Sequence, residues 1–330
     1  MPTLAAIVGI PGPTLDAATA EMFRALPPAG VILFGRNVED PAQLVALTSA
    51  LRAVLPEHAV LLVDQEGGRV ARLRLPHWRA QPSAGRIAGL YAADAKAGVR
   101  AAWLTGALIG VECAAMGFDV VCAPVLDLLV AGMSDVVGDR SFGADPAKVA
   151  ALGRAVAEGL LAAGVQPVMK HLPGHGRAKV DSHLALPVIS ATDLADLLPF
   201  QANADLPWAM TAHILYQAWD ADRPATLSPR IIAEVIRGSI GFQGVLVSDD
   251  LAMQALTGAP DSRALAALEA GCDLAMYCAG DPAGTRAVLR ACPALSTAAI
   301  QRLRSARELA QAHQIALDAA EMAAERDGLF

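Results

Sequence analysis

Residues 145–171 read DPAKVAALGRAVAEGLLAAGVQPVMKH, and the interpretation of the fold begins with them. Asp145 precedes a proline at the first helical position, which is typical of a helix start. An alanine-rich segment of helix length follows. The short apolar run Pro167–His171 then has the composition of a strand buried on both faces. A strand that follows a helix in this way is typical of α/β folds with a parallel sheet.

Similar apolar runs alternate with segments of helix length along the whole chain. The eight predicted strands are Leu4–Ile10, Val31–Phe34, Ala59–Asp64, Phe118–Ala123, Pro167–His171, Trp208–His213, Gly244–Asp249 and Asp273–Cys278. Further helix starts, an aspartate or serine followed by proline, occur at 40–41, 228–229 and 281–282. Eight β/α alternations predict an α/β protein with a (β/α)₈ TIM barrel rather than an open doubly wound sheet.

The length of 330 residues is compatible with two average domains or with one large barrel. No repeat, linker or change of composition marks a boundary, so we expect a single catalytic domain over residues 1–330. Residues 295–330 contain helical sequence rich in Ala, Arg and Glu and no strand. We expect this segment to form extra helices that pack on the outside of the barrel.

The composition excludes several classes of function. With 54% hydrophobic and 18% charged residues and a mean hydropathy of +0.41, the chain can form a sizeable core. A net charge of −7 without a long basic run argues against nucleic-acid and membrane partners. The N-terminus has no basic segment typical of a signal peptide, and the longest apolar run is too short to span a bilayer. Five cysteines without a CxxC pair indicate reduced thiols, so we expect a cytoplasmic protein.

The candidate functional residues lie where predicted strands end, which is where TIM barrels carry their chemistry. These residues are Asp64, Asp127, Lys170, His171, His213 and Asp249. The densest cluster is KHLPGHGRAKVDSH, residues 170–183, which holds two of the four lysines and three of the seven histidines. We therefore expect the active site around this segment.

Three chemical interpretations of this cluster are open. His171 and His175, with Asp181 and His183, could bind a metal, but the proline and glycines between the first two histidines break the helix that their spacing would need. Lys170 could form a Schiff base, as in a lyase, which leaves the histidines and aspartates unexplained. Asp181 lies two residues before His183 and could orient that imidazole as a general acid/base near neutral pH.

A further carboxylate comes from VSDDLAM, residues 247–253. Because side chains alternate along a strand, we do not expect Asp249 and Asp250 to face one site, and alternation leaves open which of them faces the pocket. In VDQEGGRVARL, residues 63–73, Asp64, Arg69 and Arg72 could instead form structural ion pairs. No Walker sequence or dinucleotide glycine pattern is present, so we expect no nucleotide cofactor.

The segments VDQEGGRVARL, APVLD, GDRSFG, KHLPGHGRAKVDSH, TAHILY and GFQGVLVSDDLAM, in this order and spacing, resemble glycoside hydrolase family 3. Within that family the sequence is most similar to the single-domain bacterial β-N-acetylhexosaminidases of cell-wall recycling (NagZ type), from about residue 32 to residue 282. The Asp-Ser-His element distinguishes this branch from the family 3 β-glucosidases, whose acid/base is a glutamate from another domain.

The resemblance implies a role for each matching residue. Asp249 matches the nucleophile that forms a covalent glycosyl-enzyme, His183 the acid/base on a mobile loop, and Asp181 its partner. The residues implied for binding a terminal N-acetylglucosamine are Asp64, Arg72, Arg140, Lys170 and His171, with His213 at the border of that subsite. The implied enzyme is a retaining monomer without metal or cofactor. Its implied substrate is N-acetylglucosaminyl-β-1,4-anhydro-N-acetylmuramic acid, with or without the stem peptide, in peptidoglycan recycling.

Two departures from the family and two alternatives accompany this prediction. The segment between Asp193 and Trp208 is compressed, and Arg177 and Lys179 make the loop before His183 more basic. These two cations near a histidine acid/base would also suit a phosphorylase that uses phosphate in place of water. A non-catalytic muropeptide-binding sensor is the other alternative. Neither Lys179 nor His175 receives a role.

Overall fold

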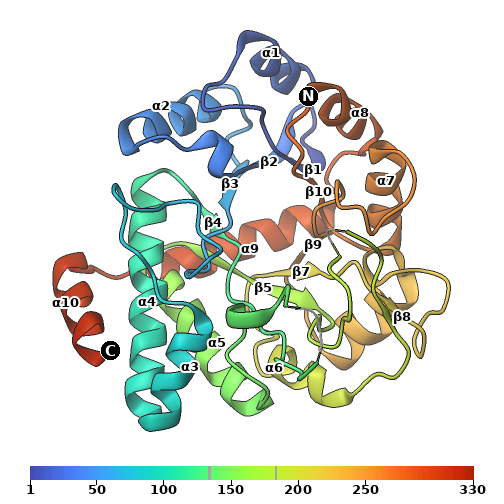
Figure 1. The fold of residues 1–330 in the computed structure, drawn as a ribbon. Helices are drawn as coiled ribbons and strands as arrows, with labels where there is room; N and C mark the ends of the chain where they lie inside the picture. The colour runs from blue at the N-terminus through green and yellow to red at the C-terminus, as the bar shows by residue number, and fades with distance from the viewer. Residues whose placement is uncertain (133–134, 183) are drawn as a thin grey trace.

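The computed structural model describes residues 1–132, 135–182 and 184–330 and shows a ring of parallel strands surrounded by helices (Figure 1). The eight strands of the ring are β1 (Leu4–Val8), β2 (Pro28–Leu33), β3 (Val60–Val63), β4 (Val120–Val121), β5 (Gln166–Leu172), β7 (Trp208–Thr211), β9 (Val245–Val247) and β10 (Ala275–Tyr277). Their order is β10-β1-β2-β3-β4-β5-β7-β9. A parallel bridge between Val247 and Leu274 joins the two end strands. The predicted (β/α)₈ barrel is confirmed.

All eight predicted strands are present, and several end earlier than predicted. The strand expected over Gly244–Asp249, for example, stops at Val247. Two further strands, β6 (Val188–Ile189) and β8 (Leu215–Tyr216), form a short parallel pair in the loops that follow β5 and β7. The sequence did not predict this pair, because a run of two residues has no recognisable periodicity.

The longer helices alternate with the strands and cover the outside of the ring. They are α1 (Ala17–Ala25), α2 (Pro41–Arg52), α3 (Ala84–Ala93), α4 (Ala95–Ala115), α5 (Pro146–Ala162), α7 (Pro260–Ala270) and α8 (Pro282–Ala291). Asp40, Asp145 and Asp281 accept hydrogen bonds from first-turn N–H groups, as the aspartate-proline pairs predict. The Ser228 hydroxyl oxygen accepts from Ile231 N–H at the start of η5 (Ile231–Ser239), a helix of π geometry.

Short helical turns complete the connections. They are η1 (Gly35–Asn37), η2 (Gly138–Arg140), η3 (Leu194–Leu197), α6 (Leu198–Gln201) and η4 (Ala225–Leu227). Together, η3 and α6 are the only helical structure between β5 and β7 among the described residues. The segment between Asp193 and Trp208, predicted to be compressed relative to the family, therefore forms two short helical turns.

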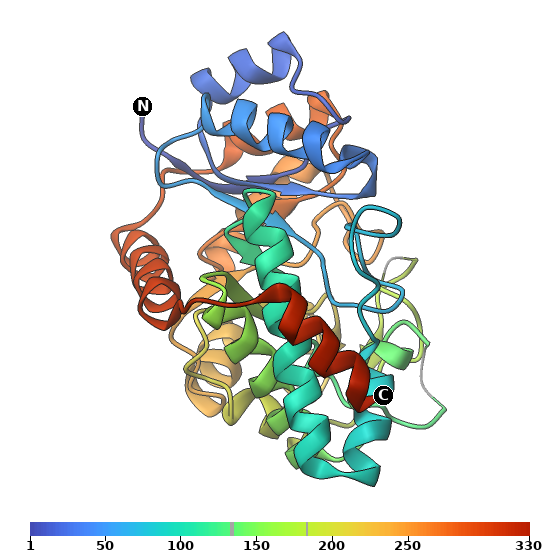
Figure 2. The ribbon, with the colours of Figure 1, turned by 90° about the vertical axis from the view of Figure 1, so that its left-hand side faces the viewer.

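The C-terminal segment adds α9 (Thr297–His313) and α10 (Ala319–Leu329). Helix α9 packs against α5 and against β5 and β9, and α10 lies on α4 (Figure 2). This arrangement confirms the expectation of extra helices on the outside of the barrel. No helix in the described part of the chain is long and apolar enough to cross a membrane.

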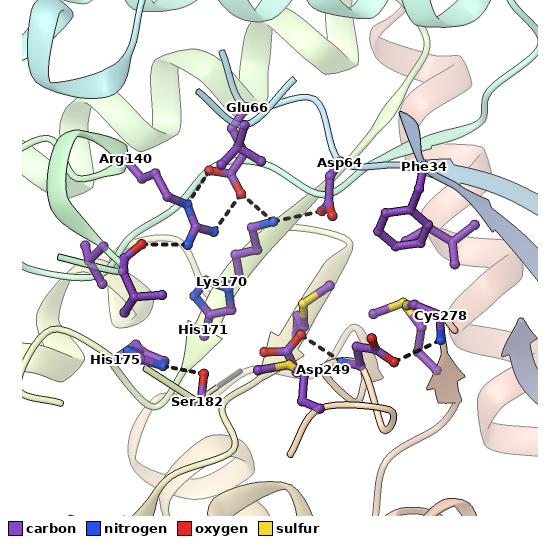
Figure 3. A pocket seen from close by; sticks show the side chains of 18 of the residues that line it. Phe34, Asp64, Glu66, Arg140, Lys170, His171, His175, Ser182, Asp249 and Cys278 are labelled. Atoms are coloured by element: carbon purple, nitrogen blue, oxygen red, sulfur yellow. Dashed lines mark hydrogen bonds and ion pairs between the residues drawn. The ribbon is translucent and has the colours of Figure 1, made fainter. Parts of the chain in front are cut away.

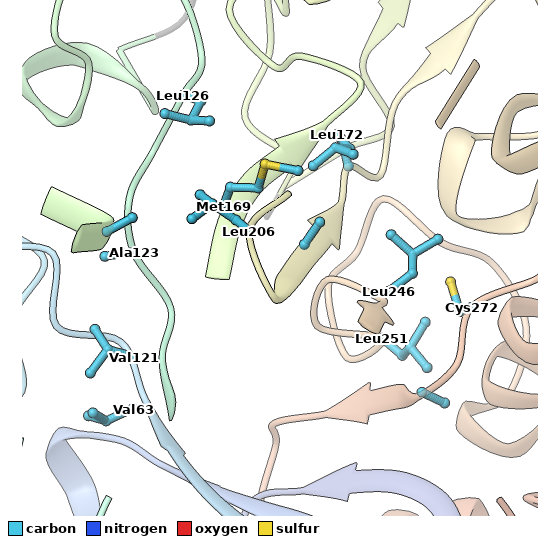
Figure 4. Close-up of a cluster of buried hydrophobic side chains, with 14 of the residues drawn as sticks. Val63, Val121, Ala123, Leu126, Met169, Leu172, Leu206, Leu246, Leu251 and Cys272 are labelled. Atoms are coloured by element: carbon cyan, nitrogen blue, oxygen red, sulfur yellow. The ribbon is translucent and has the colours of Figure 1, made fainter. Parts of the chain in front are cut away.

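The strands are buried on both faces, as expected for parallel strands covered by helices. Along β3, Val60 and Leu62 belong to the cluster that fills the inside of the ring, whereas Leu61 and Val63 belong to the layer between strands and helices. Figure 4 shows part of that outer layer, in which Val63 lies near Val121. The two layers fix the positions of the strand ends. The candidate functional side chains lie at those ends.

Candidate active site

A cavity of about 160 Å³ lies at the carboxyl ends of the barrel strands (Figure 3). Among the described residues, its polar lining consists of Asp64, Glu66, Arg72, Arg140, Lys170, His171, His175, Ser182, Asp249 and Asp250. Its apolar lining includes Ile32, Phe34, Met210, Met253, Met276 and Cys278. The cavity therefore contains five of the six sugar-binding residues that the resemblance implies, together with the implied nucleophile.

Lys170 lies in the wall of the cavity between two carboxylates. Its Nζ is 3.1 Å from Asp64 Oδ1 and 2.7 Å from Glu66 Oε1. Arg140 binds both oxygens of Glu66, each at 2.8 Å, and Arg72 is 3.0 Å from Asp64. These five residues form one charged cluster, which we call the ion cluster.

The ion cluster keeps its members charged. Burial raises the pKa of Glu66, but Lys170 and Arg140 outweigh this effect and lower it to about 2. Burial also raises the pKa of Asp64, yet Lys170 and Arg72 hold it below its ordinary value. For Lys170, burial acts to lower the pKa, but the two carboxylates raise it above that of a free lysine. The ammonium group of Lys170 is therefore protonated at neutral pH.

Asp127, in the loop after β4, binds His171 near the end of β5 and His175 in the loop that follows. Its side chain is fully buried, and its Oδ2 accepts a hydrogen bond from His171 Nδ1 at 2.7 Å. Its Oδ1 accepts from the backbone N–H of His175, also at 2.7 Å. Burial raises the pKa of Asp127, but His171 outweighs it, so the carboxyl stays ionised. The carboxylate thus fixes the ring of His171 at the cavity wall.

The loop after β5 lies close to the barrel because of its glycines. A Cβ atom on Gly176 would come 2.0 Å from the carbonyl oxygen of Leu128, and Gly174 has a φ of +134°, so neither position accepts another residue without strain. Between them His175 is buried, and its Nε2 is 3.1 Å from Ser182 Oγ. Burial lowers the pKa of His175 to about 4, so this imidazole is neutral at pH 7.

Both Asp249 and Asp250 line the cavity, and the expectation that strand alternation keeps them apart is wrong. The reason is that β9 ends at Val247, so the alternation no longer applies two residues later. Asp249 Oδ1 accepts the backbone N–H of Asp250 at 2.8 Å, and Asp250 Oδ1 accepts the backbone N–H of Cys278 at 2.9 Å. The two carboxylates thus have different backbone partners.

Their pKa values move in opposite directions. Burial raises the pKa of Asp249, but the imidazole of His171 and the backbone N–H of Asp250 outweigh it and hold it below the ordinary value. Burial raises the pKa of Asp250, and here no neighbour compensates fully. At neutral pH Asp249 is therefore the more strongly acidic carboxyl of the pair, as a nucleophile requires.

His213 does not line the cavity. It is fully buried behind Asp249, where its Nδ1 is 2.7 Å from Thr226 Oγ1 and its Nε2 is 3.0 Å from the carbonyl oxygen of Asp250. Ser182 lines the cavity next to Asp181 in sequence. His183 lies outside the described residues, so its pairing with Asp181 stays a prediction.

Arg177 does not point a free charge at the cavity. Its guanidinium binds Asp193 and Asp196, each at 2.6 Å. The segment before α6 therefore neutralises the charge that Arg177 adds to this loop. The functional residue that the sequence missed is Glu66, although it lies two positions after Asp64 in VDQEGG. Its partners Lys170 and Arg140 are too distant in sequence for any local pattern to reveal them.

The chain matches known proteins over most of its length. A family model for the N-terminal domain of glycosyl hydrolase family 3 matches residues 6–311. A β-hexosaminidase of Alkalilimnicola ehrlichii is 45% identical over 272 residues, which cover 80% of this chain and 77% of that protein. One of Methylococcus capsulatus is 41% identical over 85% of this chain and 84% of that protein.

A solved structure agrees with these sequence matches. NagZ from Neisseria gonorrhoeae, in complex with N-trifluoroacetyl-D-glucosamine, superposes with a TM-score of 0.88 at 30% identity, covering 100% of this chain and 98% of that one. The chain belongs to glycosyl hydrolase family 3. Within that family it is an enzyme of the β-hexosaminidase type.

Proposed function

We propose that the protein is a retaining β-N-acetylhexosaminidase in which Asp249 is the nucleophile. The observation that carries the proposal is the position of the Asp249 carboxylate, which lines the cavity across from Glu66 (Figure 3). Its Oδ1 is held by the Asp250 N–H, and its lowered pKa keeps it ionised. Attack by an ionised carboxylate on the anomeric carbon gives the covalent glycosyl-enzyme of a retaining mechanism.

Proton transfer is assigned to His183, with Asp181 as its partner. In the first step the His183 imidazolium donates a proton to the glycosidic oxygen while Asp249 displaces the leaving sugar. In the second step the neutral imidazole takes a proton from water, which attacks the anomeric carbon and releases Asp249. Support comes from Ser182, the residue between Asp181 and His183, because it lines the same cavity as Asp249.

Substrate binding is assigned to Asp64, Arg72, Arg140, Lys170 and His171. The ion cluster offers carboxylate oxygens as acceptors and N–H groups as donors, which suits a ligand with many hydroxyl groups. At about 160 Å³ the cavity is small beside the 300–1,000 Å³ of typical ligand pockets, which supports recognition of one terminal sugar. The N-acetylglucosamine analogue in the Neisseria structure supports the identity of that sugar.

The proposed substrate is N-acetylglucosaminyl-β-1,4-anhydro-N-acetylmuramic acid, with or without its peptide, in peptidoglycan recycling. The full-length similarity to NagZ supports this assignment. We further propose that residues 1–330 act as one catalytic domain, in a cytoplasmic monomer that needs no metal or organic cofactor.

The alternatives receive less support. A Schiff-base lyase needs a neutral lysine, but Lys170 is held as an ammonium by two carboxylates. A phosphorylase needs an unpaired cation for phosphate beside the nucleophile. Among the described residues that line the cavity, Arg72, Arg140 and Lys170 each already bind a carboxylate. The charge balance therefore favours water over a phosphate anion.

The test is hydrolysis of an aryl β-N-acetylglucosaminide by the wild type and by Asp249→Ala and His183→Ala. Each variant is expected to lose at least about 10³-fold in kcat/KM. The control is Asp222→Ala, which removes an exposed carboxylate that does not line the cavity. Wild-type turnover by Asp249→Ala would show that the nucleophile is assigned wrongly. Binding of N-acetylglucosamine without turnover by the wild type would favour a sensor.

A further inference from the structure

Three buried side chains lie behind Asp249 and form a continuous chain of hydrogen bonds. Thr211 is the last residue of β7, His213 follows two positions later, and Thr226 belongs to η4. All three are fully buried, and none lines the cavity. The function proposed above uses none of their side chains, so their common arrangement needs a separate explanation.

The direction of each hydrogen bond can be deduced from the chemistry of the groups. His213 Nε2 is 3.0 Å from the carbonyl oxygen of Asp250, which only accepts, so this nitrogen carries a proton. Burial lowers the pKa of His213, and a neutral imidazole with Nε2–H has a lone pair on Nδ1. The Thr226 hydroxyl, 2.7 Å away, therefore donates to Nδ1.

The remaining links follow from that one. The other hydrogen-bond acceptor near the Thr226 hydroxyl, the carbonyl oxygen of Ala212, is farther away at 3.1 Å. Thr226 Oγ1 is left to accept from the Thr211 hydroxyl at 2.7 Å. Thr211 Oγ1 in turn accepts the backbone N–H of Asp249 at 3.4 Å, the longest link. The chain thus runs from the backbone nitrogen of Asp249 to the backbone oxygen of Asp250.

This chain of hydrogen bonds contacts the backbone of Asp249 and Asp250 on both sides of the peptide bond that joins them. That peptide also supplies the N–H that donates to Asp249 Oδ1 at 2.8 Å. The direction of the carboxylate therefore depends on the direction of the peptide. Its orientation is fixed from both sides, because Thr211 holds the N–H of the preceding peptide (Ser248–Asp249) and His213 holds the carbonyl oxygen of the following one (Asp250–Leu251).

We propose that Thr211, Thr226 and His213 form a relay that positions Asp249 for attack, and that His213 is a positioning residue rather than a sugar ligand. The inference rests on the proposed function, because it assumes that Asp249 is the nucleophile. A carboxylate held at its reactive angle reaches the transition state without further reorientation. Loss of the relay should therefore slow the chemical step and leave ground-state binding of the sugar almost unchanged.

The decisive variant is Thr226→Val, which replaces the hydroxyl by a methyl group of similar size. We expect kcat for an aryl β-N-acetylglucosaminide to fall about tenfold, with KM and the inhibition constant of N-acetylglucosamine within twofold of the wild type. Thr226→Ser restores the hydroxyl and should recover most of kcat. The matched control is Thr285→Val, since Thr285 in α8 is equally buried and its Oγ1 has no described hydrogen-bond partner.

A double variant distinguishes a relay from separate stabilising contacts. Thr211→Val and Thr226→Val interrupt the same chain, so the double variant should lose no more kcat than the worse single variant. Independent contacts would instead give multiplicative losses and would overturn the relay. It would equally be overturned if Thr226→Val kept wild-type kcat, or if KM rose while kcat stayed constant.

Asp249→Ala is measured in parallel. If Asp249→Ala keeps its turnover, Asp249 is not the nucleophile, and the proposed function and the relay are both overturned. If Asp249→Ala is inactive while Thr226→Val behaves like the wild type, the relay alone fails and the proposed function stands. A urea unfolding curve for each variant separates an effect on kcat from a loss of folded protein.

Discussion

Replacement of Glu66 by glutamine is expected to destabilise the fold by about 3 kcal/mol at pH 7. Glutamine keeps the shape of the side chain but removes the charge that faces Arg140 and Lys170. The pKa of Glu66, lowered from 4.5 to about 2, corresponds to about 3 kcal/mol at 1.36 kcal/mol per pKa unit. Removal of one partner from a buried ion pair typically costs about 3–5 kcal/mol, which agrees with this value.

The pH dependence gives a second readout of the same interaction. Because the pKa of Glu66 is lowered in the folded state, its stabilisation is complete above the ordinary pKa of 4.5 and is lost as the pH falls toward 2. The difference in free energy of unfolding between the wild type and Glu66→Gln should therefore shrink by about 1 kcal/mol between pH 7 and pH 4.

Urea unfolding followed by circular dichroism measures both effects, and Glu112→Gln is the matched control. Glu112 binds Arg79 at 2.9 Å, but 41% of the Arg79 side chain is exposed. Such a pair contributes at most about 1 kcal/mol. Equal destabilisation by the two substitutions, or a Glu66→Gln effect that does not change with pH, would refute the view that the ion cluster is held together by buried charge.

Three further predictions concern the cavity and its loop. Lys170→Met should raise KM for the aryl glycoside at least tenfold, because Asp64 and Glu66 lose their shared cation; a loss confined to kcat would contradict this role. Ser182→Ala should lower kcat/KM about fivefold, because the hydrogen bond to His175 fixes the loop at the cavity; unchanged kinetics would contradict it. Addition of phosphate should give no sugar 1-phosphate in a product assay by mass spectrometry, and detection of that product would instead identify a phosphorylase.

The barrel could be predicted from sequence because its signals are local. Apolar runs bounded by turn residues, and aspartate-proline helix starts such as 145–146, depend only on neighbouring residues. The position of Asp249 at a strand end could be predicted for the same reason. The direction of the adjacent Asp250 could not, because the alternation rule requires the strand to continue and β9 stops at Val247.

The polar contacts of the site depend on residues far apart in sequence, and here local patterns fail. Glu66 meets Lys170 and Arg140 only when the barrel brings the ends of β3, β4 and β5 together. Arg177 reads as a free cation in the sequence, and only the fold places Asp193 and Asp196 beside it. Burial patterns likewise do not show whether a histidine faces a cavity or lies one layer behind it.

The central claim is that Asp249 forms a covalent bond to the sugar, and trapping of that bond tests it most directly. A 5-fluoro glycosyl fluoride of N-acetylglucosamine should form the glycosyl-enzyme faster than the slowed second step releases it. Mass spectrometry of a protease digest is then expected to find the sugar on the peptide that contains Asp249, and fragmentation should place it on that residue. A label on another residue, or turnover of the reagent without a covalent adduct, would contradict the account.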